Sequence, residues 1–477
     1  MFKHTKIVAT IGPSCADKKT LTQMFKAGVN VARLNFSHGT YASHKKLINN
    51  IRAVEKELGN PVAIMQDLQG PKIRLGNMPD KGVAIKAGQK IIFNTILKEY
   101  KNGEFPIAYK GLQKSLKAGE NFLIDDGHME VLIEKIVGSK IYCHVIEGGT
   151  VLSHKGLNFP SSVLKVSALS EKDKDDLEFG VKAGIDLVAL SFVHTEKDII
   201  NIKKLIKKFE KKLKLSKQLP ILVIAKIERH EAIDHLDAII REVDGLMVAR
   251  GDLGLEMPAS EVPLLQKTMI AKANAAAKPI IVATQMLDSM QHNRRPTRAE
   301  VSDVSNAVID HADAVMLSNE TASGQFPVLT VKTMAEIIRT TEISPFDDLP
   351  LPISSKELTK DAITELSRVL SFEVDAKLIV AASISGETGR LIARVRPAVP
   401  ILVATSSKRV QRQLNLSWGV IPFILHTCKH IEELVAASMA YIQKAKLAKK
   451  GDKIVVVAGE PVGDAGTVNL VEVRQIK

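Results

Sequence analysis

Two short runs of the sequence decide its fold: Ile221-Leu-Val-Ile-Ala225 followed by Lys226-Ile227-Glu228, and Gly245-Leu-Met-Val-Ala249 followed by Arg250-Gly251-Asp252. Each run is continuously apolar, as in strands that are buried on both faces of a parallel sheet, and each stops abruptly at charge. If the two strands are neighbours, two carboxylates and two cations meet at one sheet edge. Carboxylates there can hold a divalent metal, and the cations can hold phosphate or enolate oxygens. Two surface ion pairs are the alternative.

Runs of this kind recur along the chain with helical segments between them. Hydroxyl residues three positions before a carboxylate, at Ser170, Thr195 and Thr297, predict the starts of three of these helices. Eight strand-helix units of this kind predict an α/β fold with a (β/α)8 barrel. The expected strands are 6–9, 29–34, 62–65, 186–190, 221–225, 245–249, 280–283 and 313–317.

The third unit of the barrel is interrupted by residues that lack a helical pattern and read as Gly-punctuated strands. This segment, 72–166, is expected to form a small β-barrel lid domain between the two barrel segments 1–71 and 167–340. A Pro- and Ser-bearing stretch after residue 343 reads as a linker. Alternating helix and strand patterns then predict a C-terminal α/β regulatory domain over 341–477.

Composition places the chain among soluble globular proteins, with 477 residues, 45% apolar residues and a formal charge of +13. The three cysteines have no metal-ligand spacing and suggest a reducing compartment. No apolar run has the length of a membrane span, and no signal core precedes the first strand, so a cytoplasmic protein without membrane contacts is expected.

The positive charge raises the alternative of a nucleic-acid or membrane partner. The densest basic stretch, 201–217, holds eight lysines, but its apolar residues recur at helical spacing. An outer helix with a solvated lysine face is therefore favoured over a nucleic-acid site. Aromatic residues make up only 4% of the chain, which argues against base stacking.

Polar or charged residues follow nearly every predicted barrel strand, where the active sites of such barrels lie. No Ser-His-Asp or Cys-His arrangement and no well-placed phosphate-binding glycine motif is visible, so covalent acyl chemistry and classical dinucleotide binding are not indicated. The reaction types that remain compatible with these residues are metal-assisted phosphoryl transfer and enolate chemistry. The strand-end residues are Thr10, Arg33, Asn35, Ser37, His38, Asp67, Lys72, Arg74, Ser191, Lys226, Glu228, Arg250, Asp252, Thr284 and Glu320.

Seven motifs, in order over the whole chain, resemble the pyruvate kinase family. The resemblance implies transfer of a phosphoryl group from phosphoenolpyruvate to ADP, giving pyruvate and ATP, with a β domain that closes over the site. The motifs are Arg33-Leu-Asn-Phe-Ser-His-Gly39, Asp67-Leu-Gln-Gly-Pro-Lys-Ile-Arg74, Ala225-Lys-Ile-Glu228, Val248-Ala-Arg-Gly-Asp-Leu-Gly254, Ala283-Thr-Gln-Met-Leu287, Arg295-Pro-Thr-Arg-Ala-Glu300 and Ser318-Asn-Glu-Thr-Ala322.

The resemblance also implies residue roles. Glu228 and Asp252 match the ligands of Mg2+, for which Mn2+ can substitute. Lys226 and Arg33 match the cations on the phosphoryl group, and Thr284 matches part of the route that protonates the enolate, whose final donor stays open. The amides of Gly251 and Asp252 match the substrate-carboxylate site. Asn35, His38, Arg74 and Lys172 match the nucleotide side, and Glu320 matches a supporting position.

Two positions depart from the usual family pattern. Members of the family bind a monovalent cation near residues that match Asn35, Ser37, Asp67 and the Leu68 carbonyl. Potassium-requiring members carry Glu where this chain has Lys72, so its ammonium is expected to fill that space and remove the potassium requirement. Asn319 stands where Gly is usual, and Asn is expected to preserve a left-handed backbone there.

The C-terminal run Ser383-Ile-Ser-Gly-Glu-Thr-Gly-Arg390 follows a predicted strand and opens a helix, an arrangement that suits a phosphate. The family places a phosphorylated allosteric activator at this loop, which predicts an effector site at Ser383, Ser385, Gly386, Thr388, Gly389 and Arg390, with the 459–466 loop closing it. A plain helix cap is the alternative. The resemblance further implies a homotetramer. The rival function is that of another Mg2+-dependent barrel enzyme, an aldolase or lyase that acts on phosphoenolpyruvate or an enolate.

Overall fold

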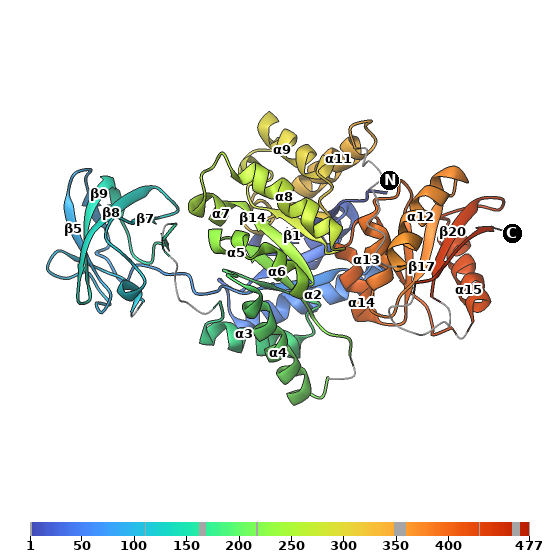
Figure 1. The fold of residues 1–477 in the computed structure, drawn as a ribbon, viewed down its shortest axis with the longest axis horizontal. Helices are drawn as coiled ribbons and strands as arrows, with labels where there is room; N and C mark the ends of the chain where they lie inside the picture. Colours follow the sequence, from blue (N-terminus) through green and yellow to red (C-terminus); the bar gives the residue numbers. More distant parts are fainter. Residues whose placement is uncertain are drawn as a thin grey trace.

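The structure is a computed structural model that describes residues 2–109, 111–160, 162, 168–215, 218–347, 359–428, 430–459 and 468–476. Three bodies follow one another along the long axis of the molecule (Figure 1). A β domain lies at one end, an α/β barrel in the middle and a second α/β domain at the other end. The predicted boundary at residue 167 and most of the 459–466 loop lie outside the described residues.

The central body is a closed barrel of eight parallel strands, which confirms the predicted barrel fold. All eight strands fall on the predicted runs. Around the barrel the strand order is β1-β16-β15-β14-β13-β12-β3-β2, so strands that are consecutive within the barrel are neighbours. The strands are β1 (Lys6–Thr10), β2 (Val31–Asn35), β3 (Ala63–Asp67), β12 (Leu187–Leu190), β13 (Leu222–Ile227), β14 (Gly245–Ala249), β15 (Ile280–Ala283) and β16 (Ala314–Leu317).

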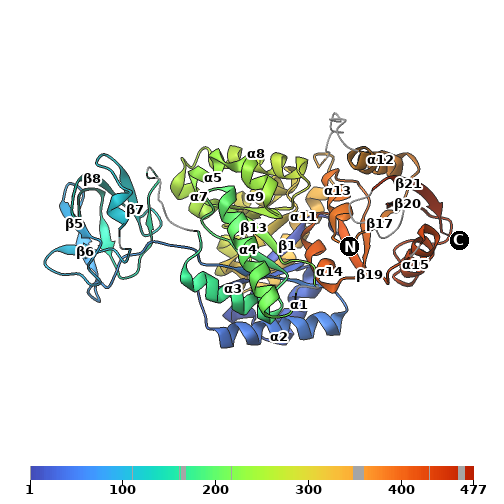
Figure 2. The same ribbon diagram turned by 60° about the horizontal axis from the view of Figure 1, so that its bottom comes forward.

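Helices surround the barrel on its outer face (Figure 2). Their starts follow the predicted capping pattern: Ser170 and Thr297 accept hydrogen bonds from the amides of Asp173 and Glu300, whose carboxylates bond back. The helices are α1 (Lys18–Ala27), α2 (Tyr41–Leu58), α3 (Glu171–Ala183), α4 (Glu196–Lys212), α5 (His230–Asp234), α6 (Leu236–Glu242), α7 (Arg250–Glu256), α8 (Val262–Ala275), α9 (Arg298–Ile309), α10 (Asn319–Ala322) and α11 (Pro327–Glu342).

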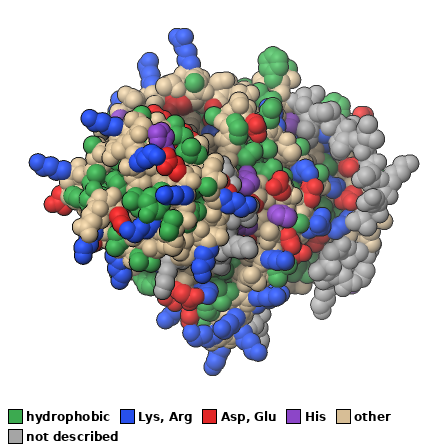
Figure 3. All heavy atoms as spheres, turned by 60° about the vertical axis from the view of Figure 1, so that its left-hand side comes forward, with side chains coloured by type: hydrophobic (Ala, Val, Ile, Leu, Met, Phe, Trp, Pro, Cys, Tyr) green, Lys and Arg blue, Asp and Glu red, His purple; other side chains and the backbone are tan. Residues whose placement is uncertain are grey.

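The lysine-rich stretch forms the outer helix α4, as expected. Ile202, Ile206 and Phe209 are buried against the barrel. The lysines between them lie on the other side of the helix, since residues three and four apart share one face. On the face of the molecule seen from the β-domain end, lysine and arginine side chains are interleaved with acidic ones (Figure 3). Neither observation favours a nucleic-acid site.

The inserted β domain leaves the barrel after β3 and returns before α3. Its described strands form a six-stranded sheet in the order β11-β7-β8-β9-β5-β6 and a two-stranded sheet of β10 and β4. A separate core containing Phe93, Phe105 and Phe122 holds it together, so the domain packs independently of the barrel. The strands are β4 (Val83–Ile85), β5 (Lys90–Asn94), β6 (Glu104–Pro106), β7 (Asn121–Ile124), β8 (Met129–Val137), β9 (Lys140–Glu147), β10 (Gly149–Val151) and β11 (Leu157–Asn158).

The C-terminal domain has a five-stranded sheet in the order β19-β18-β17-β20-β21, in which only β21 is antiparallel. Three of its strands fall on the runs that the sequence marks most clearly. The elements are α12 (Thr359–Glu373), β17 (Leu378–Ala382), α13 (Glu387–Arg394), β18 (Ile401–Thr405), α14 (Lys408–Gln413), β19 (Val420–Ile424), α15 (Ile431–Lys444), β20 (Lys453–Ala458) and β21 (Leu470–Gln475).

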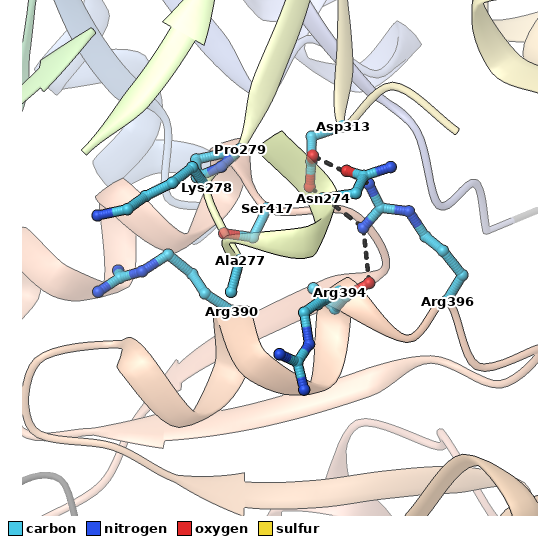
Figure 4. A pocket seen from close by; sticks show the side chains of 10 residues that line it. Asn274, Ala277, Lys278, Pro279, Asp313, Arg390, Arg394, Arg396 and Ser417 are labelled. Atoms are coloured by element: carbon cyan, nitrogen blue, oxygen red, sulfur yellow. Dashed lines mark hydrogen bonds and ion pairs between the residues drawn. The ribbon is translucent and has the colours of Figure 1, made fainter. Parts of the chain in front are cut away.

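A buried ionic network joins this domain to the base of the barrel (Figure 4). Arg396 Nη2 lies 3.0 Å from Asp313 Oδ2 and donates to the His311 carbonyl at 2.7 Å. The amide of Trp418 donates to Asp313 Oδ1 at 2.9 Å, and the Arg396 guanidinium lies 5.2 Å from the centre of the Trp418 ring. Asp313 immediately precedes β16, so the C-terminal domain is anchored directly to a barrel strand.

Among the described residues, no helix combines the length and the apolar character that crossing a membrane requires.

Candidate active site

The two runs that decide the fold form neighbouring strands, β13 and β14, with Ile227 opposite Val248. Their carboxyl ends therefore lie side by side, as predicted. The alternation of side chains along a strand explains which residues reach the site. Ile224 faces the core inside the barrel, and Lys226 and Glu228 follow it at steps of two. The same two-residue step leads from Val31 to Arg33.

Lys226 lies at the centre of this rim, with 12% of its side chain exposed. Its Nζ lies 2.7 Å from Glu228 Oε1 and 3.4 Å from Asp67 Oδ1, and it donates to Ser191 Oγ at 2.7 Å. Burial alone lowers the pKa of Lys226, but the attraction of the surrounding carboxylates, Asp67 first, outweighs burial and raises the pKa above its ordinary value. Lys226 is therefore a permanent cation within the barrel mouth.

Arg33 is the second cation at the rim, and Asp67 lies between it and Lys226. Arg33 Nε donates to Asp67 Oδ2 at 2.6 Å, while Arg33 Nη1 donates to Thr10 Oγ1 at 2.8 Å. Burial raises the pKa of Asp67, but Lys226 and Arg33 together lower it below its usual value. One buried carboxylate thus orients both cations toward the same space.

Glu228 and Asp252 suit a divalent cation. Glu228 is buried, and its Oε2 accepts the Phe192 amide at 2.7 Å. Its Oε1 faces Lys226 but has no partner in hydrogen-bond geometry. Burial, and then repulsion from Asp252, raise the pKa of Glu228 to about 7 against the effect of Lys226. Two carboxylates that repel each other supply the hard oxygen ligands that Mg2+ requires.

Thr284 and Gly251 meet across the ends of β14 and β15. Thr284 Oγ1 accepts the Gly251 amide at 2.8 Å and donates to the Ala283 carbonyl at 2.6 Å. Thr284 has a φ of 70°, and Gln285 has a φ of 55°. A left-handed conformation is rare for a β-branched residue and marks a strained position that its surroundings must hold in place.

Arg250 holds Thr284 in that conformation. Its Nη2 donates to the Thr284 carbonyl at 2.7 Å, and its Nη1 donates to Asp303 on α9 at 2.6 Å. Arg250 therefore braces the end of β15, whereas the strand-end pattern by itself suggested a charge for the substrate.

An open cleft of about 1230 Å³ lies beside this rim. Residues from both the barrel and the β domain line it, among them Asn35, Asp252 and Thr284 from the barrel and Lys72 and Asp126 from the β domain. The β domain therefore forms one wall of the candidate site, in the place expected of a lid.

Three of the four predicted nucleotide-side residues, Asn35, His38 and Lys172, lie at the end of β2, and Arg74 lies in the β domain. Asn35 lines the cleft, and its Oδ1 accepts the Ser37 amide at 3.0 Å. Lys172 donates to the Phe36 carbonyl at 2.8 Å and pairs with Asp176, which places it beside the end of β2. His38 follows β2 and is exposed. Arg74 belongs to the β domain, where it donates to the His154 carbonyl at 2.9 Å.

Among the predicted monovalent-cation residues, Asn35 lies opposite Asp67 in the β2–β3 register and accepts the Ser37 amide, but Lys72 pairs elsewhere. The Leu68 carbonyl accepts a hydrogen bond from Ser191 Oγ at 2.7 Å. Lys72 Nζ lies 3.7 Å from Asp126 Oδ1 and 3.8 Å from Asp252 Oδ1. Within the described part of the chain, these are the two ion pairs found for Lys72. Its ammonium therefore lies between Asp126 of the β domain and Asp252 of the barrel.

Glu320 connects two of the loops that carry the site. Its Oε1 accepts the Leu287 amide at 3.2 Å and its Oε2 accepts the Ser318 amide at 2.6 Å, which ties together the loops after β15 and β16. Burial raises the pKa of Glu320 above its usual value.

The expectation of a left-handed backbone at Asn319 is wrong. Asn319 is the first residue of α10 and has a negative φ, so no glycine-like conformation is needed there.

The predicted effector residues form a loop and helix start after β17. Gly386 has a φ of 82° and precedes α13, Ser385 Oγ accepts the Glu387 amide at 3.4 Å, and Ser383 Oγ accepts the Thr388 amide at 3.4 Å. These long bonds leave the amides weakly held. Gly389 lies in the first turn of α13.

Arg390 turns toward the barrel. Figure 4 shows it beside Lys278, and both line a small pocket between α13 and the barrel base. Arg390 also stays in contact with the predicted effector group, because its Nη2 donates to the Ser385 carbonyl at 3.4 Å.

Three supporting residues were not assigned a role from the sequence: Thr10, Ser191 and Asp303. Thr10 and Ser191 lie two residues beyond Val8 and Ala189, which face the barrel interior. That alternation is the signal that points to them. No local signal marks Asp303, because its role depends on the distant residue Arg250 at the end of β14.

The fold and the rim define a class: a (β/α)8 enzyme whose site neutralises the charge of an anionic substrate. Comparison with known proteins makes this specific. The family model described as "Pyruvate kinase, barrel domain" matches residues 2–331, and "Pyruvate kinase, alpha/beta domain" matches residues 361–474.

Curated relatives cover the whole chain. Pyruvate kinase 2 of Synechocystis sp. is 44% identical over all of this chain and 80% of its own length. A pyruvate kinase of Clostridium acetobutylicum is 40% identical over the full length of both chains. The crystal structure of a pyruvate kinase from Cryptosporidium parvum covers 100% of this chain and 96% of its own, with a TM-score of 0.92 and 34% identity.

The chain belongs to the pyruvate kinase family. It is therefore a phosphotransferase of the reaction that converts phosphoenolpyruvate and ADP to pyruvate and ATP, as the resemblance in the sequence implied. The family membership favours this reaction over the aldolase or lyase alternative.

We expect Arg250→Met to lower kcat by about 10²-fold, because losing the brace displaces Thr284, and a displacement of about 1 Å can cost that much. Asp303→Asn should lower kcat in the same direction, and the double variant should be no worse than Arg250→Met alone. Steady-state kinetics measures all three. Lys272→Met, which breaks the exposed pair with Asp237 on the outer face, is the control. Additive losses would show that Asp303 does not act through Arg250.

Proposed function

We propose that the barrel rim performs Mg2+-assisted phosphoryl transfer from phosphoenolpyruvate to ADP, followed by protonation of the enolate. The observation that carries this proposal is the position of Lys226, a buried cation between Asp67 and Glu228. Transfer of a phosphoryl group away from an enolate develops negative charge, and preorganised cations in a buried site stabilise such charge strongly.

Each residue at the rim then has a part. Glu228 and Asp252 would hold Mg2+, with Mn2+ as a substitute, and the bound ion supplies positive charge for the substrate oxygens. Lys226 lies over the phosphoryl group and stabilises the negative charge that develops on the enolate oxygen when the phosphorus–oxygen bond breaks. Arg33, oriented by Asp67, clamps the phosphoryl oxygens.

The other end of the substrate lies against β14 and β15. The amides of Gly251 and Asp252 are placed to receive the substrate carboxylate. The Gly251 amide is bonded to Thr284 Oγ1, so a carboxylate bound there competes for that amide and frees the hydroxyl. Thr284 then takes part in delivering a proton to the methylene carbon of the enolate. Asn35, His38, Arg74 and Lys172 are proposed for the nucleotide, with Arg74 and the β domain closing over it.

Glu228→Gln and Lys226→Met separate the two roles. We expect each to lower turnover by about 10²–10³-fold or more, as losing a transition-state charge contact does. Glu228→Gln should also weaken Mn2+ binding, measured by paramagnetic resonance of free Mn2+. Lys226→Met should retain or tighten it, because a repelling cation is removed. Glu242→Gln, an exposed carboxylate change on α6, is the matched control. Full turnover in either variant would reject the assignment.

We also propose that Lys72 replaces the monovalent cation, so that K+ is not required. Its ammonium adds one positive charge next to Asp252, within the cleft that also contains Asn35. Lys72 lies on the connection to the β domain, so closure of that domain carries the charge toward the Asn35, Ser37, Asp67 and Leu68 group.

Replacing K+ with tetramethylammonium at constant ionic strength should leave the turnover of the unmodified enzyme unchanged. Lys72→Met should make turnover dependent on K+, because the missing charge must come from solution. Lys155→Met, which removes another lysine of the β domain, should remain independent of K+. A strict loss of unmodified enzyme activity without K+ would contradict the proposal.

We further propose that the loop of Ser383, Ser385, Gly386, Thr388 and Gly389 binds a phosphorylated activator, with Arg390 linking it to the barrel base. Weakly held amides at the start of α13 favour an anion. A homotetrameric assembly and a cytoplasmic location stay predictions from the family.

Fructose 1,6-bisphosphate, sugar monophosphates and AMP are the compounds to survey at low phosphoenolpyruvate. We expect at least one to activate, and the Ser385→Ala, Thr388→Val double variant to lose that activation while its basal rate is kept. Ser406→Ala, an exposed hydroxyl after the neighbouring strand β18, is the control. Activation that survives in the double variant would leave the loop as a plain helix cap.

A further inference from the structure

A cluster of potential metal ligands lies in the C-terminal domain, far along the chain from the catalytic rim. His426 and Cys428 lie on the loop after β19, and Glu433 lies in the first turn of α15. One ligand atom of each residue lies within 4.8 Å of the others. His426 Nε2 and Glu433 Oε1 are only 3.0 Å apart.

The three residues differ in exposure in a way that suits a site open to solvent. Cys428 is 5% exposed, whereas the side chains of His426 and Glu433 are 65% and 43% exposed. The thiol of Cys428 donates to the His426 carbonyl at 3.5 Å, which keeps the sulfur at the base of the cluster. An ion can therefore enter from the surface and meet the sulfur underneath.

The ligand types select the metal. Thiolate, imidazole and carboxylate together suit Zn2+, which takes them at about 2.0–2.3 Å, and they do not suit Mg2+ or Ca2+, which prefer oxygen alone. Ligand atoms that lie within 4.8 Å of one another require only a small inward movement to reach a common ion. Three protein ligands leave a fourth position for water.

A second group with metal-ligand atoms, His230, Glu231 and Glu256, provides a contrast. There Arg229 donates to both oxygens of Glu231 at 3.0 Å and lies 3.8 Å from Glu256. An arginine already supplies the positive charge in that group, so a metal would have to displace it. No arginine is found at the His426 cluster among the described residues.

We propose that His426, Cys428 and Glu433 form a binding site for Zn2+ or a similar borderline-soft divalent cation. Binding breaks the sulfur–hydrogen bond of Cys428, releases its proton to solvent and forms a metal–sulfur bond, with no change of oxidation state. The ion then ties the β19 loop to the start of α15. β19 is parallel to β18, and β18 to β17. The loops after β19 and β17 therefore leave the same edge of the sheet, where the Ser383–Arg390 loop also lies.

The test uses full-length protein stripped with a chelator and titrated with Co2+ in saturating Mg2+. A thiolate ligand gives Co2+ a charge-transfer absorption in the near ultraviolet, which the all-oxygen catalytic site cannot produce. We expect the band to saturate at one Co2+ per chain and to vanish when Zn2+ is added. Cys428→Ser should abolish the band.

His426→Asn and Glu433→Gln change exposed side chains, so they test the site even if Cys428→Ser fails to fold. Each should weaken Co2+ binding by at least about tenfold, as loss of even an outer partner of a metal site does. Glu432→Gln, in the same helical turn, and Cys143→Ser, in the β domain, are the controls and should keep the band. Absence of the band in the unmodified protein, its survival in Cys428→Ser, or unchanged affinity in His426→Asn would overturn the proposal.

Discussion

The ion pairs of Lys226 with Asp67 and Glu228 are the interaction on which the active-site rim depends. A lone buried ammonium is very costly, and pairing with hydrogen-bonded carboxylates is what makes it tolerable. Here Asp67 comes from β3, Ser191 from the end of β12 and Glu228 from the end of β13. The cation is stable only if these strands close side by side, so the geometry of the barrel and the charge at its mouth are inseparable.

The same constraint explains why the rim is polar just above an apolar barrel interior. Side chains of parallel strands alternate, so the residues two positions beyond the interior core point into the mouth. Asp67 satisfies Lys226 and Arg33 together, which leaves both cations directed toward the cleft. Glu228 retains one oxygen without a hydrogen bond. A site built in this way attracts an anion and a divalent cation at once, which is what phosphoryl transfer requires.

The two outer domains make different kinds of contact with the barrel. The β domain has its own aromatic core and lines the cleft with side chains such as Lys72 and Asp126, so it contributes charge to the cleft. The C-terminal domain is anchored by the Arg396–Asp313 network, almost fully buried at the base of the barrel. The first arrangement suits a movable wall, and the second suits a firm connection between the Ser383–Arg390 loop and the barrel base beneath β15 and β16.

Hydrophobic runs and motifs in the sequence were sufficient for the barrel, the order of its strands, the insertion and the family. They were sufficient because a strand buried on both faces must be continuously apolar, and its end must turn polar at the rim. Strands β19 and β21 were not singled out, since Pro422 interrupts one and charged residues alternate along the other, as edge strands allow. Asn319 was misjudged because a residue type alone does not determine φ.

The sequence by itself determined which residues could supply charge, since Lys226, Glu228 and Asp252 each follow an apolar run. Only the tertiary structure decided their partners. In the tertiary structure Arg250 binds the Thr284 carbonyl and Asp303, and Lys72 pairs with Asp126 and Asp252. The reason is physical: an apolar pattern follows from local burial, but the partner of a charge depends on which distant segments packing brings within a few ångströms.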